Sequence, residues 1–285
     1  MRDLDVVRKS IGTVQPDYAI HMAAQPLVLR SYSDPIETYE TNVTGTLNFL
    51  RALNELEARP TSLVVTTDKV YRDENKTEYV ESDPLGGEDP YSASKAMADL
   101  LTQSWISTNP DLKLFVARAG NVIGSFDVSE NRLVPDIQRA IYSGKPIEIR
   151  HPDSTRPWQH VLDCLSGYLM LLFKANESHF FPKVFNFGPS PGNIKPVEDL
   201  VAEAKKSIPS LQISNQSISA SAKETKLLGL NSDRAHRLLG WHNLVDFETS
   251  VAWSLQPRSV ESPLAHAQDQ IERFLGLGAR SWLES

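Results

Sequence analysis

The chain has 285 residues, of which 40% are hydrophobic and 23% charged, as in an ordinary globular protein of one large domain or two smaller ones. A formal net charge of −7, without a cluster of lysines and arginines, argues against a nucleic-acid partner and excludes no local site for an anionic substrate. We expect no membrane span, no secretory signal, no metal site and, with Cys164 alone, no internal disulfide, which together predict a cytoplasmic protein.

Two element types alternate along the first two thirds of the chain. Apolar runs predict strands at residues 17–20, 63–66, 112–118, 146–150 and 183–187. Helical periodicity predicts helices at residues 35–56, 91–107, 133–142 and 161–173. Strands that alternate with helices of this length form right-handed βαβ units, so we expect an α/β fold with a doubly wound parallel sheet.

The last third has a looser pattern. Residues 207–221 are rich in serine and predict a loop. Helices are expected at residues 231–239, 247–255 and 265–274.

Polar motifs follow the first three predicted strands at their carboxyl ends. They are HMAAQ at 21–25, TTDK at 66–69 and RAGN at 118–121. Ligands of parallel sheets bind outside the carboxyl ends of the strands, so the motifs predict a binding site there.

Tyr91 and Lys95, in the segment YSASK, lie four residues apart and therefore share one face of a helix. The positive charge of a neighbouring lysine favours the phenolate. Such a tyrosine can accept a proton from a hydroxyl group while hydride leaves the carbon. The alternative is an ordinary amphipathic helix start. Two neighbours favour the functional interpretation. Asp89-Pro90 directly precedes the helix, and a predicted strand that ends in Asp68 lies upstream.

Six motifs occur in an order that resembles one known superfamily. They are HMAAQ, TTDK, DPLGGEDPYSASK, RAGNVIG, RLVPD and STRPWQHVLDCLSGYL. Over about residues 1–255 the chain resembles the extended short-chain dehydrogenases/reductases (NAD-dependent epimerases/dehydratases), and within them the CDP-glucose 4,6-dehydratases. Two features favour the CDP-glucose enzymes over other dehydratases. One is Lys69, at a position where the dTDP-glucose and GDP-mannose dehydratases carry glutamate, and the other is the run at 156–169. It implies a Rossmann-like sheet with a smaller C-terminal α/β substrate-binding region.

The resemblance implies a reaction on a nucleotide sugar. CDP-glucose would be oxidised at C4 by bound NAD, lose water across C5 and C6, and regain the hydride at C6 as CDP-4-keto-6-deoxyglucose, a precursor of polysaccharide deoxysugars. Elimination needs a base for the C5 proton, which the new ketone acidifies, and an acid for the C6 hydroxyl. Epimerisation is less expected, because an epimerase has no need of the Asp68/Lys69 pair.

The resemblance also implies roles for single residues. Asp68 would be the acid and Lys69, in its neutral form, the base, whereas Thr67 would bind the C4 oxygen beside Tyr91. The alternative for Asp68 and Lys69 is a solvated ion pair in a loop. The implied catalytic residues are Thr67, Asp68, Lys69, Tyr91 and Lys95.

Ligand-binding residues follow from the same motifs. The resemblance places NAD near His21, Ala23, Ala24, Gln25, Asn42, Thr66, Tyr91 and Lys95, and the substrate near Asn121, Arg132 and Arg156. Guanidinium groups match phosphate oxygens, so both arginines are candidates for the pyrophosphate. The alternatives are a packed core histidine for His21, a polar helix residue for Asn42 and surface charges for the arginines.

We expect two regions in the chain. Residues 1–124, with 158–190 packing back on them, would form an incomplete NAD-binding domain, and 125–285 a substrate-binding region that ends in an extra tail at 258–285. A homodimer through the helices 35–56 and 91–107 is implied. The alternative is burial of both helices within one subunit.

The chain departs from the family pattern in two places. It lacks the turn G-x-x-G-x-x-G, and we expect that about sixty residues of the family's first βαβαβ half are missing. The strand at Tyr18 would then be a sheet edge. The alternative function is a non-catalytic remnant or partner subunit that cannot bind NAD unaided, although the intact catalytic residues oppose it. Residues 125–128 replace a glycine pair and a tryptophan of the family.

Overall fold

The computed structural model describes residues 1–149, 151–177, 182–214, 229–255, 262–279 and 282. The chain divides into two compact units, and each is treated by itself. The first contains Met1–Ala119, Gly167–Phe187 and Leu230–Trp241. The second contains Gly120–Ser166, Gly188–Gly229 and His242–Ser285. The division after Ala119 lies five residues before the boundary that the sequence predicts.

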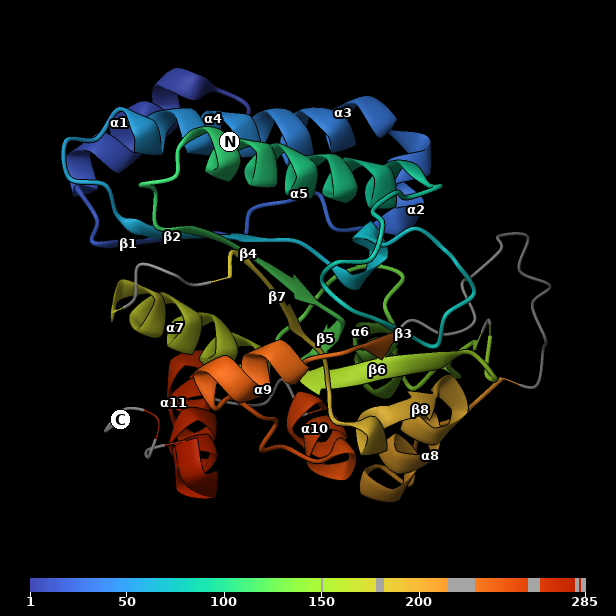
Figure 1. The fold of residues 1–285 in the computed structure, drawn as a ribbon. Coiled ribbons are helices and arrows are strands. Elements are labelled where there is room, and N and C mark those ends of the chain that lie inside the picture. The colour runs from blue at the N-terminus through green and yellow to red at the C-terminus, as the bar shows by residue number, and fades with distance from the viewer. Residues whose placement is uncertain (150, 178–181, 215–228, 256–261, 280–281, 283–285) are drawn as a thin grey trace. The chain divides into compact units, whose positions relative to one another are not determined.

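A four-stranded parallel sheet forms the centre of the first unit (Figure 1). Its strands, in the order β1-β2-β4-β7, are Tyr18–His21, Thr61–Val65, Leu114–Ala119 and Val184–Phe187. All neighbouring pairs run parallel, which confirms the predicted α/β class. β1 is an edge strand of this sheet, and its Tyr18 and Ile20 are 39% and 38% exposed.

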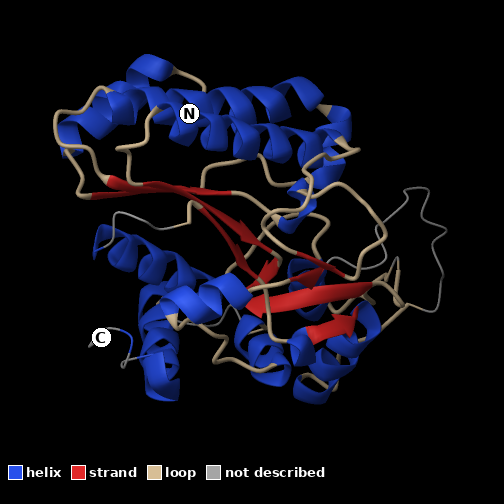
Figure 2. Cartoon of the chain, viewed as in Figure 1, coloured by secondary structure: helices blue, strands red, loops and turns tan. Residues whose placement is uncertain are grey.

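Helices α1, α3, α4 and α5 lie along one face of this sheet (Figure 2). The helices of this layer are α1 (Leu4–Val14), α2 (Val28–Ser33), α3 (Pro35–Tyr39), the π-helical segment η1 (Glu40–Thr44), α4 (Gly45–Asn54) and α5 (Pro90–Thr108). α5 starts one residue before the predicted start at 91, and the side chain of Asp89 caps it by accepting a hydrogen bond from the amide of Ser92. Phe49, Leu53 and Leu114 belong to the apolar cluster of this layer.

The first unit is completed by shorter elements. They are η2 (Asp68–Val70), β3 (Glu78–Tyr79), β9 (Gly229–Leu230), α7 (Val161–Glu177) from Gly167 onward, and α9 (Asp233–Leu239). α7 packs closely on β7, because a Cβ atom at Gly167 would lie 2.5 Å from the ring of Phe187. Arg234 of α9 donates to the carbonyl of Val184 at 2.7 Å, which holds this late segment beside β7.

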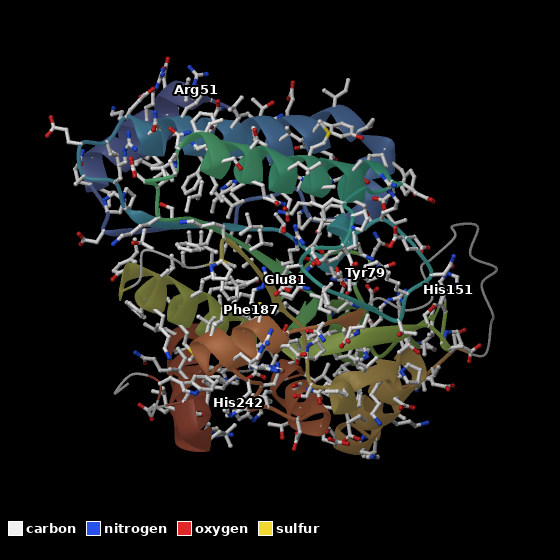
Figure 3. All side chains as sticks on the ribbon, viewed as in Figure 1. Arg51, Tyr79, Glu81, His151, Phe187 and His242 are labelled. Carbon is white, nitrogen blue, oxygen red and sulfur yellow. The ribbon has the colours of Figure 1, made fainter. Side chains whose placement is uncertain are left out.

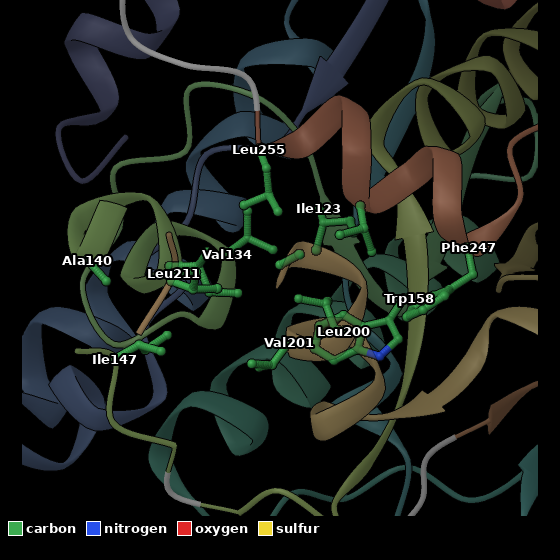
Figure 4. Packing of buried hydrophobic residues seen from close by; sticks show 13 residues of the cluster. Ile123, Val134, Ala140, Ile147, Trp158, Leu200, Val201, Leu211, Phe247 and Leu255 are labelled. Atoms are coloured by element: carbon green, nitrogen blue, oxygen red, sulfur yellow. The ribbon is translucent and has the colours of Figure 1, made fainter. Parts of the chain in front are cut away.

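The second unit is built on a three-stranded mixed sheet of β5 (Asn121–Ile123), β6 (Thr155–His160) and β8 (Ile194–Pro196). β5 and β6 are parallel, and β6 and β8 antiparallel. Its other elements are α6 (Leu133–Ser143), η3 (Pro191–Asn193), α8 (Val197–Ser207), α10 (Phe247–Ser254), α11 (Pro263–Phe274) and η4 (Leu275–Ala279). Figure 4 shows its core, in which Ile123, Trp158, Leu200 and Phe247 pack together.

One strand prediction is wrong. Residues 146–149 form no strand, and Arg150 lies outside the described residues. Ile147 makes an isolated bridge with Ile213, and Pro146 has no amide hydrogen with which to extend the ladder. Of the loop predicted at 207–221, Ser207 is the last residue of α8, residues 208–214 contain no helix, and 215–221 lie outside the described part. The helices α1, α2 and α8 and the strands β3, β5, β6, β8 and β9 were not predicted.

Candidate active site

The segment TTDK follows β2 directly. The amide of Thr66 donates to the carbonyl of Ala117 at 2.7 Å, so the strand pairing continues into the motif. Thr67 caps the short helix η2, and its hydroxyl donates to the carboxylate of Asp68 at 2.8 Å. Asp68 is 2% exposed and Lys69 is partly exposed. Burial of Asp68 argues against the alternative of two solvated charges.

Tyr91 and Lys95 occupy successive turns of α5, and both are buried. The ammonium group of Lys95 donates to the carbonyl of Val65, the last residue of β2, at 2.7 Å. Burial lowers the pKa of Lys95 to about 8, although the charge of Asp99 acts in the opposite direction. Its amine is therefore poised to change charge near neutral pH, beside the tyrosine one turn away.

Asp99, which the sequence analysis missed, holds this site together. Its carboxylate accepts hydrogen bonds from Nε and Nη2 of Arg118 at 2.8 and 2.9 Å, and from the hydroxyl of Thr66 at 2.9 Å. Arg118 is 1% and Asp99 0% exposed, so this is a fully buried ion pair. A usable signal was present: Asp99 follows Lys95 by one turn, on the same face of the helix.

The network continues from Arg118 to β7. Arg118 donates to the hydroxyl of Tyr71 at 2.8 Å, and Tyr71 donates to the side chain of Asn186 at 2.7 Å. Asn186 also donates to Glu81 and to the carbonyl of Tyr79, both labelled in Figure 3. Burial raises the pKa of Tyr71 to about 12, so its hydroxyl stays a neutral donor.

Asn42 connects the segment after β1 to the helix of the tyrosine. Its side chain accepts from the amide of Gln25 at 2.7 Å and donates to the carbonyl of Gln25 at 3.1 Å. It also donates to the hydroxyl of Ser94 at 2.8 Å, which itself donates to the carbonyl of Tyr91. Asn42 lies in the π-helical segment η1, a local irregularity that is frequent at functional sites.

His21 lies in the core, as one of its two interpretations expects. Its ring stacks on Phe49 with centroids 4.9 Å apart, and its Nε2 lies 3.1 Å from the hydroxyl of Thr46. Burial, followed by the charge of Lys95, lowers the pKa of His21 to about 4. Ala23 is exposed and Ala24 half-buried at the end of the same strand.

The three predicted substrate residues all belong to the second unit. Asn121 starts β5, and Arg132 directly precedes α6. Arg132 pairs with Asp127 at 3.5 Å, and Arg156, on β6, donates to the carbonyl of Thr155 at 2.9 Å. The structure thus gathers the predicted catalytic and cofactor residues in one unit and the predicted substrate residues in the other.

Among the described residues, no helix has the length and apolarity needed to cross a membrane. The same part of the chain also contains no group of three or more His, Cys, Asp or Glu side chains arranged to hold a metal ion.

The first unit thus combines a parallel α/β sheet, a buried tyrosine–lysine pair on one helix and an aspartate–lysine pair just after a neighbouring strand. The sequence profile of the NAD dependent epimerase/dehydratase family matches residues 1–188. The chain belongs to this family.

Similar proteins of known name agree with this assignment. The CDP-glucose 4,6-dehydratase of Salmonella typhimurium is 38% identical over 256 residues, which span 85% of this chain and 70% of that protein. A dTDP-glucose 4,6-dehydratase of Haemophilus influenzae is 27% identical over 280 residues, or 89% of this chain and 80% of that one.

Solved structures show the same fold. The UDP-glucuronic acid 4-epimerase of Bacillus cereus, in complex with UDP-glucuronic acid and NAD, matches with a TM-score of 0.78 at 18% identity, over 89% of this chain and 78% of that one. A dTDP-glucose 4,6-dehydratase of Bacillus anthracis in complex with NAD matches with a TM-score of 0.73 at 22% identity, over 90% and 76%.

The buried ion pair predicts a large loss of stability in Asp99→Ala. The change leaves Arg118 buried without a counter-charge, so the free energy of unfolding in urea should fall by about 3–5 kcal/mol. Asp269→Ala is the control, because Asp269 pairs with Arg273 at 2.9 Å on the surface. That pair should contribute less than about 1 kcal/mol. Equal losses in the two variants would contradict the central role of Asp99.

His21 predicts a loss of stability on acidification. The unfolded chain binds a proton at this histidine near pH 6.5, whereas the folded chain does so only near pH 4. The free energy of unfolding should therefore fall by about 3 kcal/mol between pH 7 and pH 4 through this group. In His21→Gln this part of the pH dependence should vanish. Phe49→Leu, which disturbs the same packing without removing a titrating group, should keep it.

Proposed function

We propose that this chain is a sugar-nucleotide 4,6-dehydratase that converts CDP-glucose to CDP-4-keto-6-deoxyglucose. The observation that carries the proposal is the adjacent Asp68 and Lys69, held on η2 at the carboxyl end of β2. An acid and a base side by side suit the elimination of water from a keto sugar. Similarity to a CDP-glucose 4,6-dehydratase over 85% of the chain supports the choice of nucleotide.

Tyr91 is proposed as the base for the C4 hydroxyl. Lys95, one turn further along α5, favours the phenolate by its charge and is itself held on the carbonyl of Val65. Thr67 is proposed to donate to the C4 oxygen. In the structure this hydroxyl donates to the carboxylate of Asp68. When a sugar binds, Thr67 would give up that bond and donate to the C4 oxygen instead.

Asp68 and Lys69 are proposed to carry out the elimination. Asp68 gives its proton to the departing C6 hydroxyl, and Lys69 removes the proton from C5. Asp68 is 2% exposed, and the hydroxyl of Thr67 bonds its carboxylate, so its position at the end of β2 is fixed. The partial exposure of Lys69 leaves its amine accessible to a substrate.

NAD is the cofactor of the family to which this chain belongs. The residues present suit a dinucleotide: Ala23 is small and exposed after β1, so a ligand can approach the backbone there. When bound, NAD supplies the hydride acceptor for C4 and the hydride donor for C6. We propose contacts to NAD from His21, Ala23, Ala24, Gln25, Asn42, Thr66, Tyr91 and Lys95.

The second unit is proposed to bind the nucleotide sugar. Arg132 and Arg156 would contact the pyrophosphate, and Asn121 the sugar or a phosphate. We further propose a homodimer through α3, α4 and α5. The first and third of these helices expose Ile36 (70%), Met97 (48%) and Leu100 (52%). Apolar side chains exposed on neighbouring helices are typical of an interface.

The direct test is turnover by the 285-residue chain. Calorimetric titration first measures NAD binding, and the protein is then incubated with NAD and CDP-glucose. We expect the 4-keto-6-deoxy product from CDP-glucose, with slower conversion of dTDP-glucose and UDP-glucose. A folded chain that binds NAD and makes no product from CDP-glucose would refute the proposal. Conversion of UDP-glucose to its C4 epimer would assign an epimerase instead.

Lys69→Ala tests the division of roles at the active site. The variant should still oxidise C4, seen as absorbance of the reduced cofactor, whereas product formation should fall at least about 100-fold for loss of a general base. Lys9→Ala, an exposed lysine on α1, is the matched control and should behave as the unmodified chain. Normal dehydration by Lys69→Ala would remove Lys69 from the mechanism.

A further inference from the structure

The C-terminal helix α11 (Pro263–Phe274) is bonded to the loop that follows β5. The hydroxyl of Ser125 donates to the carbonyl of Trp253 at 2.6 Å. The side-chain amide of Gln270 donates to both of these groups, to the hydroxyl at 3.1 Å and to the carbonyl at 2.9 Å. The three residues therefore form a closed triangle of hydrogen bonds. It joins the loop, the C-terminal part of α10 and α11.

The donors of this triangle match its acceptors. A hydroxyl has one donor hydrogen, which Ser125 gives to Trp253, so it can only accept from Gln270. The two amide hydrogens of Gln270 suffice for its two acceptors. Gln270 is 7% exposed, whereas Ser125 and Trp253 are half-buried. Its loss would remove a donor from the hydroxyl, which also lies 3.4 Å from Nε2 of His266, and one of the two donors to the carbonyl.

A second contact from α11 supports the next residue of the loop. The ring of His266 meets the ring of Phe126 edge-on, with centroids 5.3 Å apart. Phe126 has a φ of 64°, a left-handed conformation that is costly for an aromatic residue. Such a conformation persists only where the surroundings hold it, and the ring of His266 packs on this otherwise exposed side chain.

The far end of the loop reaches Arg132. Asp127 pairs with Arg132 at 3.5 Å, and Arg139 of α6 donates to the carbonyls of Val128 and Ser129. Residues 125–132 are thus held at their start by α11 and at their end by α6. The helix α11 lies outside residues 1–188, to which the family profile matches.

We propose that α11 is a brace that positions loop 125–132 for binding the diphosphate of the nucleotide sugar, with Gln270 as its positioning residue. The inference rests on the proposed function, because Arg132 is the group that the brace would present to the substrate. Gln270 touches no reacting atom in this account. Its loss should weaken substrate binding and leave the chemical step unchanged.

Gln270→Leu tests the brace, and Gln268→Leu is the matched control, because Gln268 is exposed on the same helix. Hydrogen exchange measured by mass spectrometry should be about tenfold faster at amides 125–132 in Gln270→Leu and unchanged in Gln268→Leu. The Kd for CDP-glucose, by calorimetry, should rise about tenfold in Gln270→Leu alone, with kcat within about twofold. A merely structural role would lower stability without moving Kd.

The outcomes separate the two proposals. If the unmodified chain binds CDP-glucose and Gln270→Leu binds it equally well, the brace is refuted and the proposed function stands. If the unmodified chain binds no nucleotide sugar, the proposed function fails, and the substrate role of the brace fails with it. Should Gln270→Leu not fold, Ser125→Ala removes two of the three bonds of the triangle. Unchanged exchange at amides 126–132 in that variant would overturn the brace.

Discussion

The buried pair of Asp99 and Arg118 is the interaction on which the first unit depends. Its carboxylate joins the end of β2, through Thr66, to β4, through Arg118, and Arg118 continues through Tyr71 to Asn186 on β7. Three parallel strands are therefore tied together at their carboxyl ends, where ligands of such sheets bind. A buried ion pair adds little net stability by itself, but breaking it is costly. The pair thus holds the segment TTDK at the end of β2.

The hydrogen bonds of buried polar groups differ between the two units, in agreement with their proposed functions. In the first unit, Lys95 and Asp99 of α5 bond the end of β2, through the carbonyl of Val65 and the hydroxyl of Thr66, so α5 and the segment TTDK are held together. In the second, the carboxylate of Asp163 accepts from the amides of Leu244 and Val245, although burial raises its pKa to about 6. The predicted binding residues of the second unit lie on a loop and near strand ends, positions that can adapt to a ligand.

Sequence reasoning predicted most of the first unit because its elements are long or strongly apolar. The helix 35–56 was predicted as one element and contains a π-helical turn at Asn42, which periodicity does not reveal because the turn shifts the pattern by one residue. The strand at 146–150 failed because apolar Ile147 and Ile149 serve a helix-lined core rather than a sheet. Of the site, the strand-end motifs were found from local sequence. Asp99 was missed because its partners Thr66 and Arg118 are distant in the chain.

The sequence by itself determined the α/β class, the positions of the motifs at strand ends and the spacing of Tyr91 and Lys95. These depend on local periodicity, which short segments carry. Only the tertiary structure decided which charges are buried and what they bind. It pairs Asp99 with Arg118, places His21 against Phe49 and bonds Gln270 to Ser125. Burial and pairing arise from contacts between residues far apart in the chain, and no local pattern specifies them.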